Sequence, residues 1–164
     1  MKRLYIIRHA KSSWQDISLR DIERPLNKRG KNDGPLMARV LHNKGYLIEH
    51  IILSPSQRTK DTAAYFKKEF EIPDTRIHFE EGLYHGYSGD FENIIYGLPD
   101  EINNVALFGH NPGITFIANS CIGRPISNVP TTGVVVLDAD IEQWVDFSFE
   151  KAIMENFLFP KQYK

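Results

Sequence analysis

Two patterns of apolar and polar positions alternate along most of the chain. Short apolar runs predict buried strands, and apolar residues at helical spacing between them predict amphipathic helices. The predicted strands cover residues 3–7, 50–53, 76–79 and 104–108, and the predicted helices cover residues 28–43, 54–72, 90–96 and 112–121. Strands that alternate with helices favour an α/β fold. We therefore expect a three-layer α/β/α sandwich around a mostly parallel sheet.

Capping residues indicate where the two longest helices begin and end. Asn27 is suited to cap the first of them, and Gly45 is suited to stop it. Gly34-Pro35 lies inside the same pattern and predicts a kink or a later start near residue 34. Ser54 and Pro55 have the character of an N-cap and a first helical residue for the second helix.

The last third of the chain has a different pattern. Residues 133–137 and 144–149 look like two strands joined by the acidic turn region 138–142. With no helix predicted between them, we expect an antiparallel addition at the edge of the sheet. No linker, internal repeat or low-complexity segment separates the parts of the chain, so we expect one domain over residues 1–164.

Composition narrows the possible functions. A net charge of -1 argues against a dedicated nucleic-acid binder, which normally presents a positive surface. No run approaches the ~20 apolar residues of a membrane span, and the sequence enters its first predicted strand directly after Met1-Lys2-Arg3. We therefore expect a cytoplasmic protein that binds neither membrane nor nucleic acid. Cys121 is the only cysteine, which excludes an internal disulfide and a thiolate metal cluster.

Arg8-His9 stands directly after the first apolar run, where a strand would end. Ligand sites of open α/β sheets gather at the carboxyl ends of strands. An arginine fork suits a phosphoryl group, and a neutral imidazole can act as a nucleophile toward phosphorus. Taken alone, the pair could equally be solvated or structural.

Two further segments also join an apolar run to an anion-binding residue. Arg58 falls in the first turn of a predicted helix, where a cation opposes the helix dipole unless an anion is shared there; the alternative is a surface pair with Asp61. His110 follows the strand at 104–108 and precedes a helix N-terminus; the alternative is a capping or core histidine. If these strand ends meet in one crevice, they supply donors for the oxygens of a phosphoryl group.

Four motifs resemble those of a known family when taken in order. They are Arg8-His9-Ala10, residues 24–30 (RPLNKRG), residues 54–63 (SPSQRTKDTA) and residues 109–112 (GHNP). The sequence is similar to the histidine phosphatase superfamily of phosphoglycerate mutases and acid phosphatases. Its short length and Arg-His-Ala-Lys opening resemble the SixA-type phosphohistidine phosphatase branch. The resemblance runs from residue 4 to about residue 137 and implies a phosphoglycerate mutase-like fold.

The resemblance also implies roles for the motif residues. His9 would be the nucleophile that becomes phosphohistidine, Arg8 and Arg58 would hold the phosphoryl oxygens, and His110 would complete the pocket. Water would then hydrolyse the phosphoenzyme. This chemistry needs no cofactor and no metal, and the two histidines lack the third nearby ligand that a zinc site would require.

The general acid is less well defined by the family pattern. The wider family often places a glutamate after its third strand, where this sequence offers Glu80, Glu81 and His85 as candidates. A phosphoramidate leaving group is readily protonated and depends less on such an acid. We also expect three residues to support substrate binding around the pocket: Arg24, Ser13 and Asn111. For Arg24 the alternative is a pair with Asp21.

The sequence thus predicts a phosphohydrolase that acts on a phosphohistidine protein or a small phosphomonoester through a phosphoenzyme on His9. Two alternatives remain open at this point. One is a phosphate-binding module without catalysis, and the other is a mutase that passes the phosphoryl group to a second acceptor. No long insertion that could form a lid is visible, which favours an accessible site.

Overall fold

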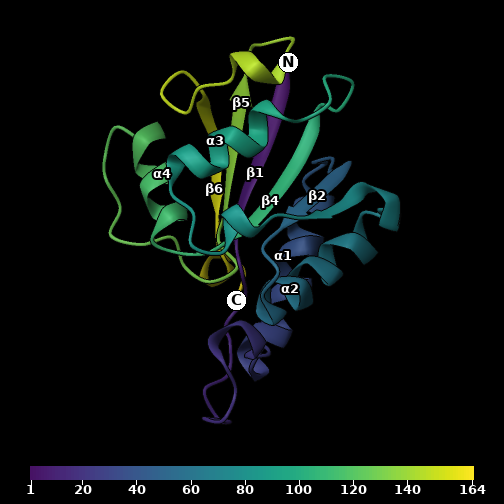
Figure 1. Cartoon of the computed structure of the whole chain (residues 1–164), viewed down its shortest axis with the longest axis vertical. Coiled ribbons are helices and arrows are strands. Elements are labelled where there is room, and N and C mark those ends of the chain that lie inside the picture. The colour runs from purple at the N-terminus through teal and green to yellow at the C-terminus, as the bar shows by residue number, and fades with distance from the viewer.

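The computed structural model describes residues 1–164 and is organised around one six-stranded sheet (Figure 1). The strands are Lys2–Arg8 (β1), His50–Leu53 (β2), Ile77–Phe79 (β3), Asn104–Gly109 (β4), Val134–Ala139 (β5) and Ile153–Leu158 (β6). Their order is β3-β2-β4-β1-β5-β6. The first four in this order run parallel, whereas β5 is antiparallel to both β1 and β6. The expected parallel sheet with an antiparallel edge addition is confirmed.

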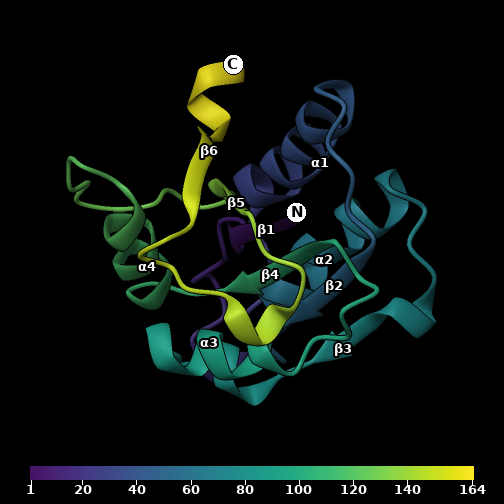
Figure 2. The same ribbon diagram turned by 90° about the horizontal axis from the view of Figure 1, so that it is seen from above.

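Helices cover both faces of the sheet (Figure 2). They are Lys28–Asn43 (α1), Gln57–Glu69 (α2), Ser88–Tyr96 (α3) and Gly113–Cys121 (α4). α1 and α2 pack on one face and α3 and α4 on the other, which completes the three layers. β1 contributes to both cores in alternation, because Leu4 and Ile6 pack toward α3 and α4 while Tyr5 and Ile7 pack toward α1 and α2.

The two long helices differ from the sequence prediction in detail. α1 begins after Asn27, whose side chain accepts a hydrogen bond from the Gly30 amide, and it continues through Gly34-Pro35. Packing overrides the local preference here, since Gly34 lies directly against the Tyr65 ring of α2. The cap of α2 is Ser56, not Ser54, and its hydroxyl accepts from the Thr59 amide.

The prediction of a strand at residues 144–149 was wrong. Trp144–Asp146 forms a single 3-10 turn, and the strand that pairs with β5 lies later, at β6. Trp144, Phe147 and Phe149 are buried because their side chains fill the core on the α3 face. The Trp144 indole donates to the Ile102 carbonyl at 2.8 Å. Aromatic residues of a loop whose side chains are buried in the core thus produced an apolar pattern like that of a strand.

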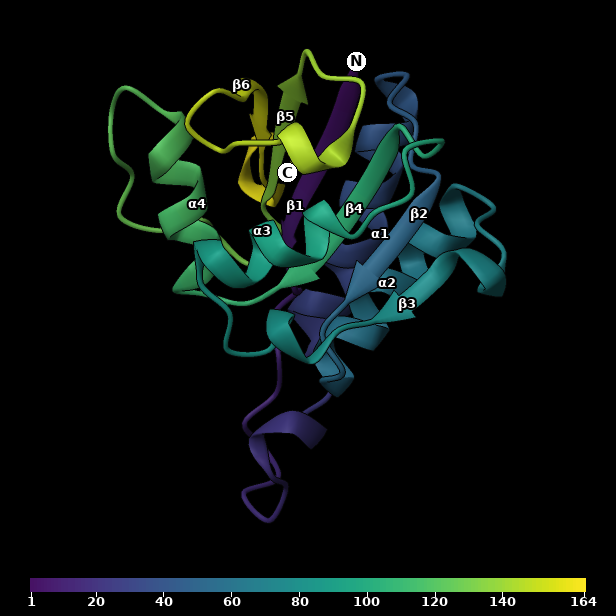
Figure 3. The same cartoon turned by 45° about the horizontal axis from the view of Figure 1, so that its top comes forward.

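A loop over residues 9–27 leaves the end of β1 and projects from the body before α1 begins (Figure 3). Its two limbs meet at an isolated antiparallel bridge between Ser12 and Leu26. The loop also passes close to α1, since a Cβ added to Gly30 would lie 2.2 Å from the Lys11 carbonyl oxygen. A glycine is therefore required where this loop meets the body.

None of the helices is both long and apolar enough to cross a lipid bilayer.

Candidate active site

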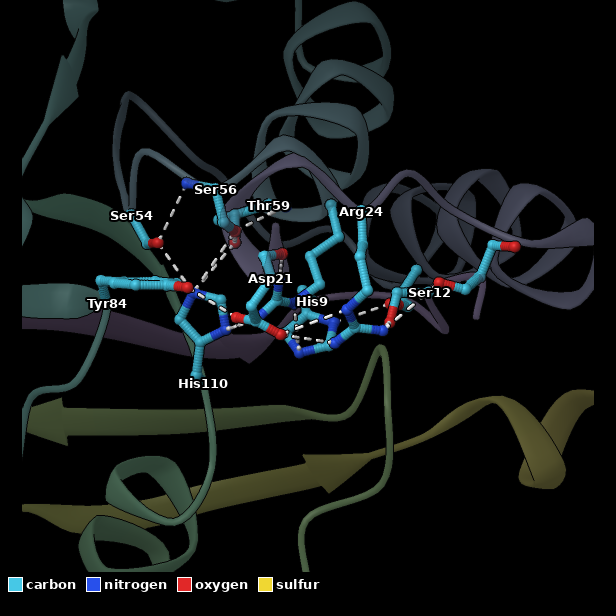
Figure 4. A network of polar contacts seen from close by, with 12 residues as sticks. His9, Ser12, Asp21, Arg24, Ser54, Ser56, Thr59, Tyr84 and His110 are labelled. Carbon is cyan, nitrogen blue, oxygen red and sulfur yellow. Dashed lines mark hydrogen bonds and ion pairs between the residues drawn. The ribbon is translucent and has the colours of Figure 1, made fainter. Parts of the chain in front are cut away.

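Three neighbouring parallel strands end at one edge of the sheet and bring their following residues together (Figure 4). His9 follows β1, Ser54 follows β2 and His110 follows β4. The register places Arg8 beside Gly109 and Leu53 beside Phe108, so the chain positions after them meet. The imidazole ring centres of His9 and His110 are 4.9 Å apart. The sequence expectation that strand ends converge therefore holds in the structure.

The His9 ring has a defined orientation and tautomer. Its Nδ1 lies 2.7 Å from the Ala10 carbonyl oxygen, which can only accept, so Nδ1 must carry the proton. Nε2 then keeps a lone pair, which faces the Arg58 Nε at 3.4 Å. The His9 backbone is held on both sides, with its amide donating to the Gly109 carbonyl and its carbonyl accepting from the Thr132 amide. The His9 ring is therefore held rigidly, and its Nε2 is the nitrogen that carries no proton.

Arg58 lies buried in the first turn of α2 and uses two edges of its guanidinium. The side edge, formed by Nε and Nη2, faces the His9 Nε2 at 3.4 Å and the His110 Nδ1 at 3.3 Å. The end edge, formed by Nη1 and Nη2, donates to the Asp21 carbonyl oxygen at 2.7 Å and to its Oδ2 at 3.0 Å. Arg58 thus does not pair with Asp61, which accepts from Gln57 instead.

His110 is oriented by hydroxyl groups from the start of α2. Its Nε2 lies 2.7 Å from the Ser54 hydroxyl, and the hydroxyls of Ser56 and Thr59 are also within hydrogen-bond distance. Since Arg58 can only donate, Nδ1 is the acceptor and Nε2 carries the proton. His110 therefore also directs a lone pair at the side edge of Arg58.

Burial and positive charge keep both histidines neutral. Desolvation lowers the pKa of His9 to about 3, and the charges of Arg58, Arg8 and Arg24 act in the same direction against its hydrogen bond to Ala10. Desolvation, with His9 and Arg58 nearby, lowers the pKa of His110 to about 2. A neutral imidazole with a free lone pair is the form that can attack an electrophile.

Arg8 reaches the same pocket from the end of β1. Its Nη1 donates to the Val129 carbonyl at 2.8 Å and to the Asn128 side chain at 3.2 Å. Asn111, which we expected to contact substrate, donates to Asn128 at 2.6 Å and so supports Arg8. The Arg8 Nε is buried and has no hydrogen-bond partner, and desolvation together with the charge of Arg58 lowers the pKa of Arg8. An unpaired buried donor of this kind is suited to an incoming anion.

Asp21 and Tyr84 belong to the site, although the sequence analysis did not place them there. The Tyr84 hydroxyl donates to Asp21 Oδ2 at 2.5 Å, and the Tyr84 ring stands edge-on to His110. Partial burial opposes the charge of Asp21, but hydrogen bonds from Tyr84, Arg24 and Arg58 hold its pKa well below the ordinary range. Burial and the hydrogen bond to Asp21 raise the pKa of Tyr84.

Arg24 is buried and makes contacts within the projecting loop, to Asp21 and to the segment that follows His9. It donates to Asp21 Oδ1 at 2.9 Å and to the Ser12 hydroxyl at 2.7 Å, and its guanidinium lies 3.5 Å from the centre of the Trp14 ring. Ser13, an expected binding residue, offers Arg24 only its carbonyl oxygen, because its hydroxyl accepts from the Gln15 amide.

The three candidates for a general acid lie in different surroundings. The His85 ring packs against the Tyr84 ring, with ring centres 4.1 Å apart and planes inclined by 50°, which places it at the rim of the site. Glu80 is exposed and lines a surface hollow with His78 and Asn93. Glu81 is exposed in the 3-10 turn before Tyr84. Neither glutamate forms a hydrogen bond or ion pair with the residues around His9.

Comparison with known proteins defines the class. Residues 4–101 match the histidine phosphatase superfamily, branch 1. An uncharacterized chloroplastic protein of Arabidopsis thaliana is 33% identical over 152 residues, covering 87% of this chain and 69% of that protein. An uncharacterized protein of Mycobacterium leprae is 25% identical over 94% of this chain and 100% of that protein. The chain belongs to the histidine phosphatase superfamily.

Solved structures refine this class. A structure from Agrobacterium tumefaciens assigned as phosphohistidine phosphatase SixA has a TM-score of 0.81 at 27% identity, over 97% of this chain and 98% of that chain. The protein histidine phosphatase SixA complexed with tungstate has a TM-score of 0.82 at 21% identity, over 99% of each chain, a likeness of fold. The protein is a phosphatase-family member of the SixA type, with the phosphoglycerate mutase-like fold.

No three His, Cys, Asp or Glu side chains come together in the structure as a metal site would require.

Proposed function

We propose that the protein hydrolyses phosphoryl groups through a covalent phosphohistidine on His9. One observation carries this proposal: the side edge of Arg58 faces the free nitrogens of both His9 and His110. A phosphoryl group bound to that edge meets the His9 Nε2 lone pair. Arg8 supplies a further buried donor from the adjacent strand end.

The reaction proceeds in two displacements. In the first, His9 Nε2 forms a bond to phosphorus while the bond to the leaving atom breaks, and the leaving group keeps the electron pair and takes a proton from solvent. In the second, water attacks phosphorus and gives up a proton to solvent, the P–N bond breaks, its electron pair returns to His9 and inorganic phosphate departs. The arginines stabilise charge on the equatorial oxygens in both steps. The negative charge of a phosphoryl group bound between Arg58 and His110 also favours protonation of His110 at Nδ1. His110 would then donate to the phosphoryl oxygens together with Arg58 Nε, Arg58 Nη2 and Arg8 Nε.

The proposed substrate class is a phosphohistidine-bearing protein in preference to an alkyl phosphomonoester. Asp21 is the carboxyl group that pairs with Arg58, and its depressed pKa makes it a poor proton donor at neutral pH. A departing imidazole nitrogen is basic enough to be protonated without a strong built-in acid, whereas an alkoxide is not. The relatives whose names refer to phosphohistidine or to a protein histidine phosphatase support this choice.

The test compares phosphohistidine protein, p-nitrophenyl phosphate and an alkyl phosphate as substrates for the wild type and for His9→Ala. We expect turnover in that order, and loss of more than ~1,000-fold in His9→Ala because the nucleophile is absent. His42→Ala is the matched control, since His42 is exposed on α1 and pairs with Glu69. Its activity should equal that of the wild type.

A phosphoenzyme trapped in alkaline detergent, in which a phosphoramidate survives, would identify the intermediate. Full turnover by His9→Ala would exclude the assigned nucleophile. Binding of phosphate with neither turnover nor a trapped phosphoenzyme would instead indicate a non-catalytic phosphate-binding module. Transfer to a second acceptor with little free phosphate would indicate a mutase.

A further inference from the structure

Asp21 holds the edge of Arg58 that faces away from the two histidines. Its backbone carbonyl accepts from Nη1 at 2.7 Å and its Oδ2 accepts from Nη2 at 3.0 Å. One residue therefore occupies both nitrogens of the end edge. The guanidinium is planar and rigid, so fixing the end edge also fixes the direction of the side edge.

The same carboxylate joins two cations and a phenol. Oδ1 accepts from both Nε and Nη2 of Arg24, at 3.2 and 2.9 Å, and Oδ2 accepts a hydrogen bond from the Tyr84 hydroxyl. Arg24 and Arg58 are both buried, and their charges repel each other unless an anion lies between them. The negative charge of Asp21 offsets that repulsion, although half of its side chain is exposed to solvent.

We propose that Asp21 is a positioning residue for phosphoryl transfer, which aims the side edge of Arg58 at the phosphoryl group between His9 and His110. The inference rests on the proposed function, because it assumes that Arg58 binds the transferring group. Asp21 supplies geometry and charge to the arginine and forms no hydrogen bond with His9.

Two other roles for Asp21 fit the structure less well. As a general acid it would need its proton at neutral pH, but the donors around it favour the ionised form. As an anion that blocks the pocket it would have to occupy the side edge of Arg58, whereas its oxygens accept from the end edge. Substrate and Asp21 can therefore bind the same guanidinium together.

The experiment compares Asp21→Asn, Asp21→Glu and Asp16→Asn in the full-length protein. Asp16 is the matched control, because it lies on the same loop but its carboxylate accepts hydrogen bonds only from Ser18. With p-nitrophenyl phosphate we expect kcat of Asp21→Asn to fall roughly 10- to 100-fold, as for other partners that orient a ligand-binding side chain. KM and the inhibition constant of inorganic phosphate should change less than about threefold, since a tetrahedral ground state tolerates a misaligned arginine better than the transition state does.

Asp21→Glu should recover part of the lost kcat because it restores the carboxylate, and Asp16→Asn should match the wild type. Tyr84→Phe provides a second variant if Asp21→Asn folds poorly. It keeps the carboxylate but removes one donor, and we expect a two- to fivefold fall in kcat with an unchanged unfolding midpoint.

Three outcomes would overturn the inference. The first is a wild-type kcat in Asp21→Asn. The second is a higher kcat with tighter inhibition by phosphate, which would show that Asp21 competes with the substrate. The third is a loss of kcat that only follows a loss of folded protein. If His9→Ala is inactive in the same assays, these outcomes leave the proposed function intact, whereas an active His9→Ala would remove the basis of both.

Discussion

The two halves of the pocket are built by different means. The sheet half consists of Arg8, which ends β1, and of His9 and His110, which directly follow β1 and β4; all three are held by backbone hydrogen bonds between strands. The loop half consists of Asp21 and Arg24, which are held by side-chain contacts on a projecting segment with one isolated β-bridge. Arg58, on α2, contacts both halves.

The two halves therefore differ in the role that we propose for them and in how freely their sequence can vary. The sheet half carries the groups that we propose to touch phosphorus, and its backbone cannot shift without disturbing the core strands. The loop half contacts Arg58 from outside and is partly exposed. A loop of this kind can change in sequence without rebuilding the sheet, so it is the part of the site in which relatives of one fold can differ in substrate.

The first prediction compares the loss of kcat/KM when Arg58 or Arg24 is replaced by lysine. Arg58→Lys keeps the charge but loses the side edge that faces both histidines, so we expect kcat/KM to fall roughly 100- to 1,000-fold. Arg24→Lys should cost only about 3- to 10-fold, because Arg24 acts through Asp21 and Ser12. Steady-state kinetics with one substrate measures both. Equal losses would mean that the pocket does not divide into these halves.

Acid should lower the free energy of unfolding of the protein through the two histidines of the sheet half. The ordinary pKa of a histidine is near 6.5, whereas burial lowers it to about 3 for His9 and about 2 for His110. Below about pH 6.5 the unfolded chain binds protons that the folded chain does not, so stability is complete above this pH and falls as the pH drops. From pH 7 to pH 5 we expect a loss of about 2 kcal/mol for each histidine.

Denaturant unfolding at pH 7, 6 and 5 measures this loss, and the variant His110→Gln provides the comparison. Removal of His110 should reduce the loss between pH 7 and pH 5 by about 2 kcal/mol. An unchanged dependence would show that His110 is not protonated on unfolding, contrary to its buried neutral state.

The smallest expected effect concerns the junction between the loop and the body. Gly30→Ala places a methyl group against the Lys11 carbonyl and should lower the free energy of unfolding by about 1–3 kcal/mol. Gly123→Ala is the control, because a Cβ there meets no atom within 4 Å. Thermal unfolding of both variants gives the difference. A neutral Gly30→Ala would mean that the loop half can move away from α1 at little cost.

The sheet half could be predicted from sequence, whereas of the loop half only Arg24 was expected near the pocket. Apolar runs mark where strands end, so Arg8-His9 and Gly109-His110 could be assigned to one edge before any coordinates existed. Asp21 carries no local signal, because its contact with Arg58 depends on how a polar loop folds back over the strand ends. The same limit applies to Ser54, whose neighbouring proline suggested a helix cap, while in the structure its hydroxyl lies against His110.

The hydrogen bond from His9 to the Ala10 carbonyl has a consequence for the chemistry of the intermediate. Phosphohistidine exists as two isomers that differ in which ring nitrogen bears phosphorus. Because the proton of Nδ1 is engaged by the adjacent carbonyl, only Nε2 has a lone pair to offer. The backbone of the residue after the proposed nucleophile thereby selects the isomer, and a phosphoenzyme formed on His9 would be the Nε2-linked one.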